Sequence, residues 1–456
     1  MDETSRAQVD LIREAFYYQS RFDGTTMVFK IDFPITGDPR FPFLMKDLAL
    51  LAETGIRIVI VPGAKEWIDS VLGEYDIVSE YSGSVRITTE DAIPFVKMAA
   101  FDAATRFMTE LSACRVDAVV GNFVRARGLG VVDGTDFRNS GKVDRILTES
   151  LRRLLDLGMV PILPCIGWSS SGKPYNLPSD EIALAACAAL GAVKFFIVSA
   201  DPGISGDRQK LPESLRHAEN GRVARLTPAE ADDLLALNRR DARPEGEGPR
   251  PEDRALAELE LAIRACRAGV ERVHLVDGRE EGAVLRELFS NLGVGTMVYA
   301  DEYESIRSME AKDIAEVLRL MEPLMASGIL LRRSAEDLAE KKEDYVVYEV
   351  DGSVHACGAL HDWGEFQGEI AGLATDPAYA DLGLGRRIVR FLIDRAGKRS
   401  FRRVFALTTK TQDWFELLGF REASVDSLPE RKRRAYDAKR RSKVFALDLG
   451  EASRNR

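Results

Sequence analysis

The chain of 456 residues carries 73 acidic against 63 basic residues, a formal net charge of −10, and 45% of its residues are apolar. Such a chain can bury sizeable cores, and its length predicts two or three domains. An acidic balance argues against nucleic acid as a general partner. No apolar run approaches the length needed to span a membrane, and the polar start MDETSRAQVD lacks the apolar core of a signal peptide.

The cysteines indicate a reducing environment. Cys114, Cys165, Cys187, Cys266 and Cys357 are odd in number and form no CxxC or His/Cys cluster. This spacing supports neither a disulfide framework nor a zinc site. We therefore expect no bound metal and a cytoplasmic location, where thiols stay reduced.

Strand and helix patterns alternate through roughly the first 300 residues. An amphipathic helix is predicted for residues 8–21. Apolar runs typical of buried strands lie at 27–31, 56–61, 116–120, 159–163, 194–199 and 272–276. Helical periodicity appears at 44–54, 65–74, 147–157, 180–190 and 253–268. The alternation predicts an open parallel sheet with helices on both faces, an α/β fold.

The stretch 202–253 breaks this alternation. It is rich in Pro, Gly and charge, notably ARPEGEGPRPED. This composition predicts an exposed or mobile insertion inside the first domain.

The pattern changes near residue 305, where we place a domain boundary between 1–304 and 305–456. A helix is predicted for 310–321. Strands are predicted near 329–333, 345–350 and 354–361. Asp351-Gly352 joins the last two as a hairpin turn.

The segment GEIAGLATDPAYADLGLGRRIVRFLIDRAG, residues 368–397, has the pattern of a strand, a glycine-containing loop and a helix. Free N–H groups at such a helix start form an anion site with the helix dipole, and Arg386 stands beside it. The segment resembles the acetyl-CoA-binding motif of the GNAT N-acetyltransferases, Q/R-x-x-G-x-G/A, with Ala380 in place of Gln or Arg. The resemblance implies an α+β domain that uses acetyl-CoA as co-substrate. It assigns cofactor binding to Leu373, Ala374, Asp381, Leu382, Gly383, Leu384, Gly385 and Arg386.

Several segments of the first domain carry a second resemblance, among them TMVFKIDF, IRIVIVPGAKEWID, VRITTEDA and HLVDGREEGAVLRELFSNLGVGT. They are similar to the amino-acid kinase family, most closely to its acetylglutamate kinase branch. However, Asp32-Phe33-Pro34 replaces the phosphate-binding glycine pair after Lys30, and the second glycine loop keeps only Gly63. Asp180 remains, but the late segment with the phosphoryl-stabilising lysine is absent. We therefore predict a catalytically degenerate, regulatory domain.

The same resemblance implies L-arginine as an effector and a homo-oligomer, a hexamer or smaller, built through the N-terminal helix. The implied effector residues are Tyr18, His274, Glu287 and Gly293. Glu287 can pair with a guanidinium in bidentate fashion. On spacing alone, a solvated Glu287 and a core His274 are the simpler interpretations.

Acetyl transfer to an amine requires a base, a donor to the thioester oxygen, and an acceptor site. Glu369 opens the central strand and is the candidate base, and the backbone N–H of Leu373 is the candidate donor. Segments 403–420 and 427–450 are similar to those of bacterial N-acetylglutamate synthases. This resemblance implies Thr408 at the reacting centre, where many GNAT enzymes have a Tyr. It implies substrate-carboxylate binding by Arg440 and Ser442, with Lys432 and one of Arg332 or Arg333 as weaker candidates.

The combined resemblance spans nearly the whole chain. It implies synthesis of N-acetyl-L-glutamate from acetyl-CoA and L-glutamate, the first step of arginine biosynthesis. Direct attack by the amine is expected, because no cysteine lies in the acetyl-CoA motif to carry the acetyl group. Two alternatives stay open: a bifunctional enzyme that retains kinase activity, and a non-catalytic arginine-sensing protein.

Overall fold

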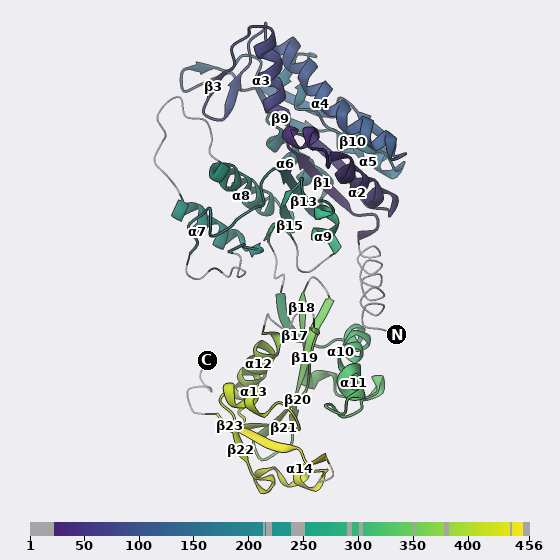
Figure 1. Ribbon diagram of the computed structural model, residues 1–456, viewed down its shortest axis with the longest axis vertical. Helices are drawn as coiled ribbons and strands as arrows, with labels where there is room; N and C mark the ends of the chain where they lie inside the picture. The colour runs from purple at the N-terminus through teal and green to yellow at the C-terminus, as the bar shows by residue number, and fades with distance from the viewer. Residues whose placement is uncertain are drawn as a thin grey trace. The chain divides into compact units, whose positions relative to one another are not determined.

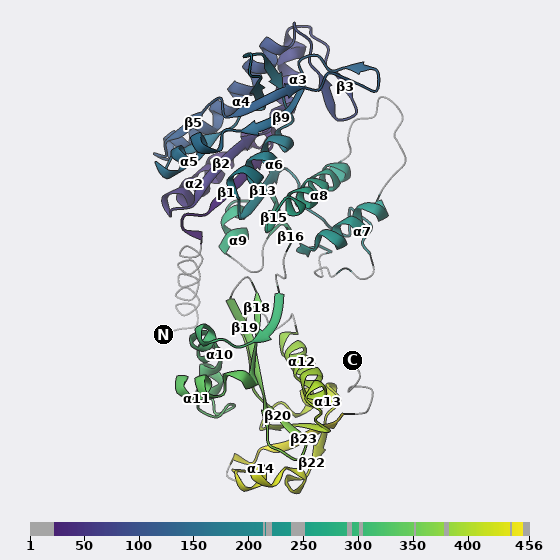
Figure 2. The same ribbon diagram turned by 180° about the vertical axis from the view of Figure 1, so that it is seen from behind.

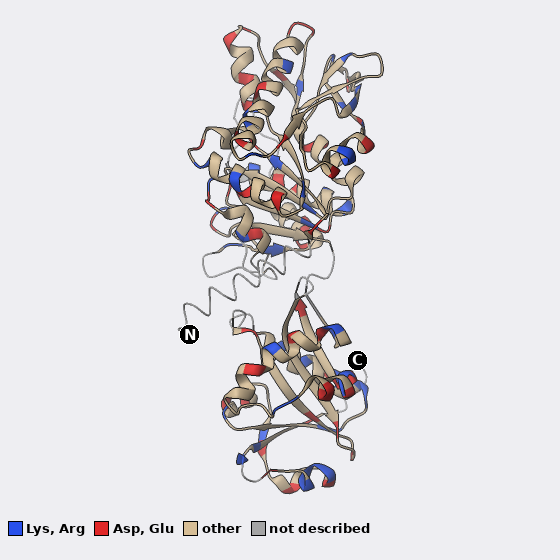
Figure 3. Cartoon of the chain, turned by 90° about the vertical axis from the view of Figure 1, so that its right-hand side faces the viewer, with Lys and Arg blue, Asp and Glu red and all other residues tan. Residues whose placement is uncertain are grey.

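The computed structural model forms two compact units, Met1–Asp301 and Glu302–Arg456 (Figure 1; Figure 2). The structure describes residues 22–212, 215, 221–238, 251–289, 294–300, 304–350, 353–377, 383–437 and 440–449. The predicted helix 8–21 lies outside these residues. Over the described ranges, no helix is both long and apolar enough to cross a membrane. Acidic and basic residues are interspersed over each unit (Figure 3).

The first unit is built on an eight-stranded sheet. In spatial order its strands are β14 (Arg225–Leu226), β16 (Thr296–Tyr299), β15 (Arg272–Asp277), β13 (Lys194–Ser199), β1 (Thr26–Ile31), β2 (Arg57–Pro62), β10 (Val160–Ile162) and β5 (Ala118–Val120). The strands from β15 to β5 pair in parallel, whereas β16 pairs antiparallel with β15. The predicted parallel sheet is confirmed, apart from the reversed edge.

Helices cover both faces of this sheet, as predicted. They are α2 (Phe41–Glu53), α3 (Lys65–Glu74), α4 (Ile93–Ala113), α5 (Thr148–Asp156), α6 (Ser179–Leu190), α7 (Pro228–Asn238), α8 (Pro251–Arg267) and α9 (Ala283–Phe289). Neighbouring residues of β1 enter two different cores: Val28 packs with residues of α3, α6 and α8, and Phe29 with residues of α2 and α9. Successive side chains of a strand point to opposite faces of the sheet, so a central strand covered by helices on both faces buries all of them.

Some elements of this unit were not predicted. A second sheet contains β12 (Pro174–Asn176), β11 (Ile166–Trp168), β6 (Val124–Gly128) and β9 (Gly141–Ile146). Two hairpins are formed by β3 (Glu80–Ser82) with β4 (Val85–Ile87) and by β7 (Val131–Val132) with β8 (Thr135–Asp136). These strands are short and mostly half-exposed, so they lack the long apolar runs of the main sheet. Helix α4 was also missed.

The prediction that 202–253 is exposed is wrong for its described part. Ile204, Val223 and Leu226 are fully buried, and β14 extends the main sheet at its edge. Helix α7 packs against α8 and buries Leu234. The few apolar residues of this stretch are widely spaced among Pro, Gly and charged residues, so no periodic pattern reveals them. Residues 213–214, 216–220 and 239–250 lie outside the described ranges.

The second unit has a seven-stranded sheet. In spatial order its strands are β17 (Glu304–Ser308), β18 (Tyr345–Val350), β19 (Ser353–Asp362), β20 (Gln367–Thr375), β21 (Arg403–Thr408), β23 (Lys443–Asp448) and β22 (Arg421–Ala423). Its helices are α10 (Ile314–Ala326), α11 (Ala335–Glu340), α12 (Leu384–Lys398), α13 (Gln412–Leu417) and α14 (Glu430–Arg434). Among the described strands of this unit, β20 and β21 are the only two that pair in parallel. Strand β23, which follows β22 in the chain, lies between β21 and β22.

Two details of this unit test the predicted elements. The predicted strand 329–333 is wrong, because these residues form the connection from α10 to α11. The turn at 351–352 lies outside the described residues, but Val350 pairs with Ser353, as a two-residue hairpin requires.

The centre of this sheet opens into a notch. Strand β20 pairs with β21 only over Gln367–Glu369, and beyond Glu369 the two strands separate. Gly372, with a φ of 61°, lies where the register of β20 shifts against β19. Helices α10 and α12 cover opposite faces of the sheet beside this opening (Figure 1; Figure 2). Backbone groups of β20 past Glu369 are therefore left without a partner from β21.

Candidate active site

Glu369 stands at the last paired position before the notch. It is only 6% exposed, and Nζ of Lys432, on α14, donates to both of its carboxylate oxygens at 2.7 Å. The indole Nε1 of Trp363 donates to Oε2 of Glu369 at 2.8 Å. The candidate base and one candidate substrate binder thus form a buried ion pair. Trp363 was not predicted, and its place six residues before Glu369, across the β19–β20 turn, was the available signal.

Arg333 faces the same notch from the loop between α10 and α11. Its guanidinium lies 5.5 Å from the ring centroid of Tyr345, and its Nη1 lies 2.7 Å from where a Cβ on Gly372 would stand. Over the described residues, Nη1 is buried and has no hydrogen-bond partner. Burial lowers the pKa of Arg333, and the nearby charge of Glu369 acts in the opposite direction. Arg332 is exposed, so Arg333 is the member of the pair that lies beside the notch.

Arg440 and Ser442 approach this loop from the segment after α14. Nη2 of Arg440 donates to the carbonyl oxygens of Gly328 and Ile329, each at 3.0 Å. These carbonyls follow the end of α10 and precede Arg333, so Arg440 holds the loop that carries Arg333. Ser442 is buried, and its carbonyl oxygen accepts the hydroxyl hydrogen of Tyr436 at 2.7 Å.

Thr408 ends β21 on the other side of the notch. Its hydroxyl oxygen accepts the backbone N–H of Thr411 at 3.0 Å and lies 2.7 Å from the Thr411 hydroxyl. This local bond closes the turn into α13. Because Phe405 pairs with Glu369, Thr408 lies three residues farther along β21, at the level where β20 carries Gly372.

The predicted cofactor loop leads into α12. Gly383 precedes the helix in a left-handed conformation, with a φ of 63°, and Leu384 is buried in the first turn. A Cβ on Gly385 would stand 3.2 Å from the ring of Trp414, so α12 and α13 approach closely at this glycine. Arg386 is exposed, Ala374 is buried and Leu373 is half-buried. Asp381 and Leu382 lie outside the described residues.

In the first unit, charged side chains pair with one another at the segment that corresponds to the kinase phosphate loop. Nζ of Lys30 lies 2.7 Å from Asp32 and 3.1 Å from Asp180, and Arg254 of α8 lies 3.2 Å from Asp32. Burial alone would lower the pKa of Lys30, but Asp180 and Asp32 raise it above its ordinary value. Residues Phe33–Gly37 form a 3-10 helix where a flexible glycine loop is expected. Lys30 is therefore neutralised by carboxylates of its own chain.

The two described effector candidates form a buried pair. Nδ1 of His274 lies 2.9 Å from Oε1 of Glu287, and Oε2 accepts the backbone N–H groups of Val294 at 2.7 Å and Gly295 at 3.1 Å. Burial lowers the pKa of His274 to about 4, so its neutral ring donates to an ionised Glu287. Glu287 is not a solvated helix residue. Tyr18 and Gly293 lie outside the described residues.

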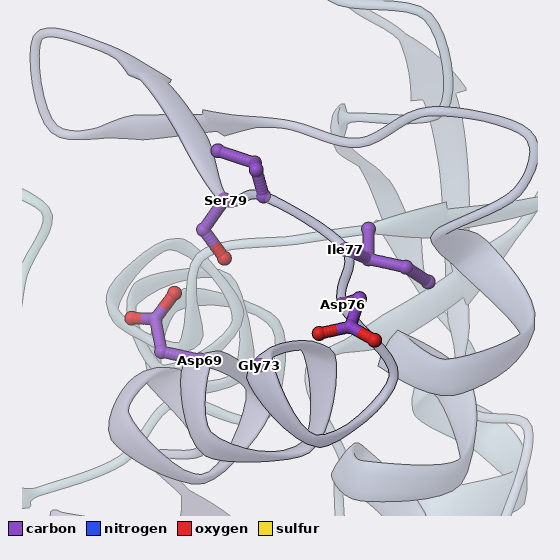
Figure 4. Close-up of a pocket in the computed structure, with 6 residues that line it drawn as sticks. Asp69, Gly73, Asp76, Ile77 and Ser79 are labelled. Atoms are coloured by element: carbon purple, nitrogen blue, oxygen red, sulfur yellow. The ribbon is translucent and has the colours of Figure 1, made fainter.

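A separate pocket of about 420 Å³ lies between α3 and the start of β3, in the first unit (Figure 4). Its lining consists of Asp69, Gly73, Asp76, Ile77, Val78 and Ser79. Arg86, from the kinase-like segment VRITTEDA, pairs with Asp69 beside it and is buried. None of the catalytic, binding or effector residues predicted above lines this pocket.

The chain is similar to known proteins over nearly its whole length. The amino acid kinase family matches residues 35–277, and the GNAT acetyltransferase family matches residues 313–420. An amino-acid acetyltransferase of Shewanella oneidensis is 37% identical over 453 residues, 97% of each chain. That of Pasteurella multocida is 34% identical over 97% of this chain and 98% of its own.

Solved structures extend this similarity to the fold. A crystal structure of N-acetylglutamate synthase from Neisseria gonorrhoeae, complexed with coenzyme A and L-arginine, is 31% identical with a TM-score of 0.82. The match covers 97% of this chain and 99% of the chain of that enzyme. The complex of that enzyme with coenzyme A and N-acetyl-glutamate is 32% identical, with a TM-score of 0.58. The chain therefore belongs to the amino-acid acetyltransferases that join an amino-acid-kinase-like domain to a GNAT domain, and it is an acyltransferase with acetyl-CoA as its co-substrate.

Proposed function

We propose that the protein acetylates the α-amino group of L-glutamate to give N-acetyl-L-glutamate, the first step of arginine biosynthesis. The observation that carries this proposal is the charge of the notch. Glu369 is balanced by Lys432, and the half-buried Arg333 adds a guanidinium whose buried Nη1 has no partner among the described residues. The three groups together carry one net positive charge. Glutamate, with two carboxylates and one ammonium, carries one net negative charge, so it complements the notch.

The proposed reaction is direct acetyl transfer. Glu369 takes a proton from the substrate ammonium, directly or through water, and the free amine attacks the thioester carbonyl carbon. The backbone N–H of Leu373 stabilises the oxyanion. The new C–N bond forms as the C–S bond breaks. The thiolate of coenzyme A takes one proton through Thr408 or water, and a second proton passes to solvent.

The substrate carboxylates are assigned to the cationic side of the notch. Arg333 is the proposed clamp for one carboxylate because its guanidinium is already desolvated and positioned. Arg440 and Ser442 are proposed to bind the other, while Nη2 of Arg440 holds the loop. Nζ of Lys432 donates two of its N–H groups to Glu369, and we propose that its third N–H binds a substrate carboxylate.

For the cofactor, the proposed cradle is the start of α12. Amides from Gly383 to Arg386 would bind the pyrophosphate, because the first N–H groups of a helix lack partners within it. Ala374, Asp381 and Leu382 complete the proposed cofactor-binding set. The solved relative bound to coenzyme A supports the cofactor itself.

We also propose L-arginine as the effector of the first domain, residues 1–304, and a homo-oligomeric assembly. The relative complexed with L-arginine supports the ligand. Glu287 would be the anionic partner of the guanidinium, with Tyr18, His274 and Gly293 around it. Among the described residues Oε2 of Glu287 accepts two hydrogen bonds and Oε1 only that of His274, so Oε1 is the oxygen with a lone pair left for the guanidinium.

A coenzyme A release assay against a panel of amino acids, with and without arginine, tests the function. We expect glutamate to give the highest kcat/KM. Glu369→Gln is expected to lower kcat by roughly 10²- to 10⁴-fold, the usual contribution of a general base. Unchanged transfer in both Glu369→Gln and Arg440→Ala would overturn the site. Absence of transfer to any amino acid would favour the sensor alternative.

A further inference from the structure

Trp363 makes the two oxygens of Glu369 unequal. Oε2 receives two donors, Nε1 of Trp363 at 2.8 Å and Nζ of Lys432 at 2.7 Å. Oε1 receives only Nζ of Lys432, at 2.7 Å, from the described part of the chain. An ionised carboxylate has about four lone-pair sites, two on each oxygen. Oε1 is therefore the oxygen that still has room for a further hydrogen.

The same indole also holds the other half of the ion pair. Nζ of Lys432 lies 4.6 Å from the ring centroid of Trp363, within the range of a cation–π contact. Trp363 thus touches Glu369 through its edge and Lys432 through its face. Its ring packs against the small core of Phe405, Leu428 and Val444, which fixes its orientation.

The turn that carries Trp363 is built for this placement. Gly364, Glu365 and Phe366 all have positive φ angles, 80°, 54° and 57°. Two consecutive non-glycine residues in the left-handed region are strained, so the surrounding structure must hold them there. One such contact is the backbone N–H of Glu430, at the start of α14, which donates to the Glu365 carboxylate at 3.0 Å. Two contacts therefore hold this segment to α14: the Glu430–Glu365 hydrogen bond and the contact of Lys432 with the ring of Trp363.

We propose that Trp363 is a positioning residue for acetyl transfer: it occupies Oε2 of Glu369 and holds Lys432, so that Oε1 alone is presented to the substrate amine. This inference rests on the proposed role of Glu369 as the base. The indole touches neither substrate nor cofactor in this scheme and acts through the carboxylate. Loss of the N–H would let the carboxylate rotate, which lowers the fraction of productive geometry rather than substrate binding.

Two substitutions separate the edge of the indole from its face. Trp363→Phe keeps a ring beside Lys432 and removes the N–H, whereas Trp363→Gln keeps an N–H donor and removes the ring. We expect Trp363→Phe to lower kcat by about tenfold or more, the value of one hydrogen bond to a charged group, with both KM values within about twofold. Trp363→Gln should recover the part of kcat that depends on the N–H, and its remaining deficit measures the contact of the ring with Lys432. Trp168→Phe, in the other unit, is the matched control and should match the wild type.

The readouts are steady-state kinetics on the full chain and calorimetric unfolding. An unchanged kcat in Trp363→Phe would overturn the proposal. So would a loss of kcat accompanied by higher KM values and a lower Tm, because that pattern belongs to a packing role. The substrate is the amino acid with the highest kcat/KM in the panel. If that is not glutamate, the proposed function fails while the effect of Trp363 is still measured.

Discussion

Nζ of Lys432 lies 2.7 Å from both carboxylate oxygens of Glu369, and both side chains are buried. The pair joins α14 to the central strand β20, so it connects the C-terminal segment with the strand that borders the notch. Burial makes the two charges interdependent, because a lone charge at this position would lack both water and a counter-ion.

Lys432→Met is expected to destabilise the protein by about 3–5 kcal/mol, the cost of leaving one partner of a buried ion pair alone. The double variant Glu369→Gln, Lys432→Met should recover part of this loss, since neither charge remains. Lys443→Met is the control, because its partner Glu422 is exposed, and it should cost less than about 1 kcal/mol. Urea unfolding followed by circular dichroism measures all three. Equal losses in Lys432→Met and Lys443→Met would contradict the interpretation.

Arg333→Ala is expected to raise the KM for glutamate by roughly 10- to 100-fold, because a desolvated guanidinium is lost from the notch. The exposed Arg332 supplies the matched control, and Arg332→Ala should change KM by less than about twofold. The preference for glutamate over glutamine should fall in Arg333→Ala alone. Initial rates with glutamate and glutamine measure both effects. Equal changes in Arg333→Ala and Arg332→Ala would contradict Arg333 as the carboxylate-binding residue.

His274 predicts a pH-dependent stability of the first unit. Its pKa is lowered by burial from 6.5 to about 4, so the unfolded chain binds more protons between these values. Stability is therefore full above about pH 6.5 and falls as the pH is lowered towards 4, by about 3 kcal/mol at most. His274→Asn keeps a donor for Glu287 and should flatten this window. The wild type and His274→Asn are compared by their denaturation midpoints at pH 7, 6 and 5. The same dependence of the midpoint on pH in both proteins would contradict the role of His274.

The Lys30–Asp32 pair predicts no phosphoryl transfer. A carboxylate at 2.7 Å from Nζ of Lys30 repels the phosphates that this lysine would otherwise bind. We expect no ADP from MgATP and N-acetylglutamate, and no binding heat for MgATP in calorimetry. ADP formation that depends on N-acetylglutamate would establish the bifunctional alternative.

Gly372→Ala is expected to impair both stability and turnover. The residue has a φ of 61°, and a Cβ there would lie 2.7 Å from Nη1 of Arg333. The backbone strain alone costs of order 1–3 kcal/mol, and the displaced guanidinium should raise the KM for glutamate. Kinetics and thermal unfolding measure the two effects. A variant with wild-type KM would show that Arg333 does not contact the substrate.

The long apolar runs made most of the fold predictable. β1, β2 and β13 can be recognised in the sequence because both faces of a parallel sheet are covered, which makes these strands mostly apolar. The short strand β14 and the buried Val223 were missed because their burial depends on contacts far along the chain. Local periodicity carries no information about such contacts.

The candidate site divides in a similar way. Glu369 and Gly383 could be proposed from the sequence because strand, loop and helix follow one another directly. The choice of Arg333 over Arg332 required the structure, since neighbouring loop residues point in directions that spacing does not encode. Trp363 was missed because its contact with Glu369 depends on the left-handed turn that follows it.

The position of β23 has a consequence for synthesis on the ribosome. Strand β22 is made first, yet it reaches the sheet only through β23, which pairs with β21 on its other side. Until residues 443–448 have emerged, both β21 and β22 present unpaired backbone edges. A nascent chain stalled in this interval exposes two strand templates to other chains.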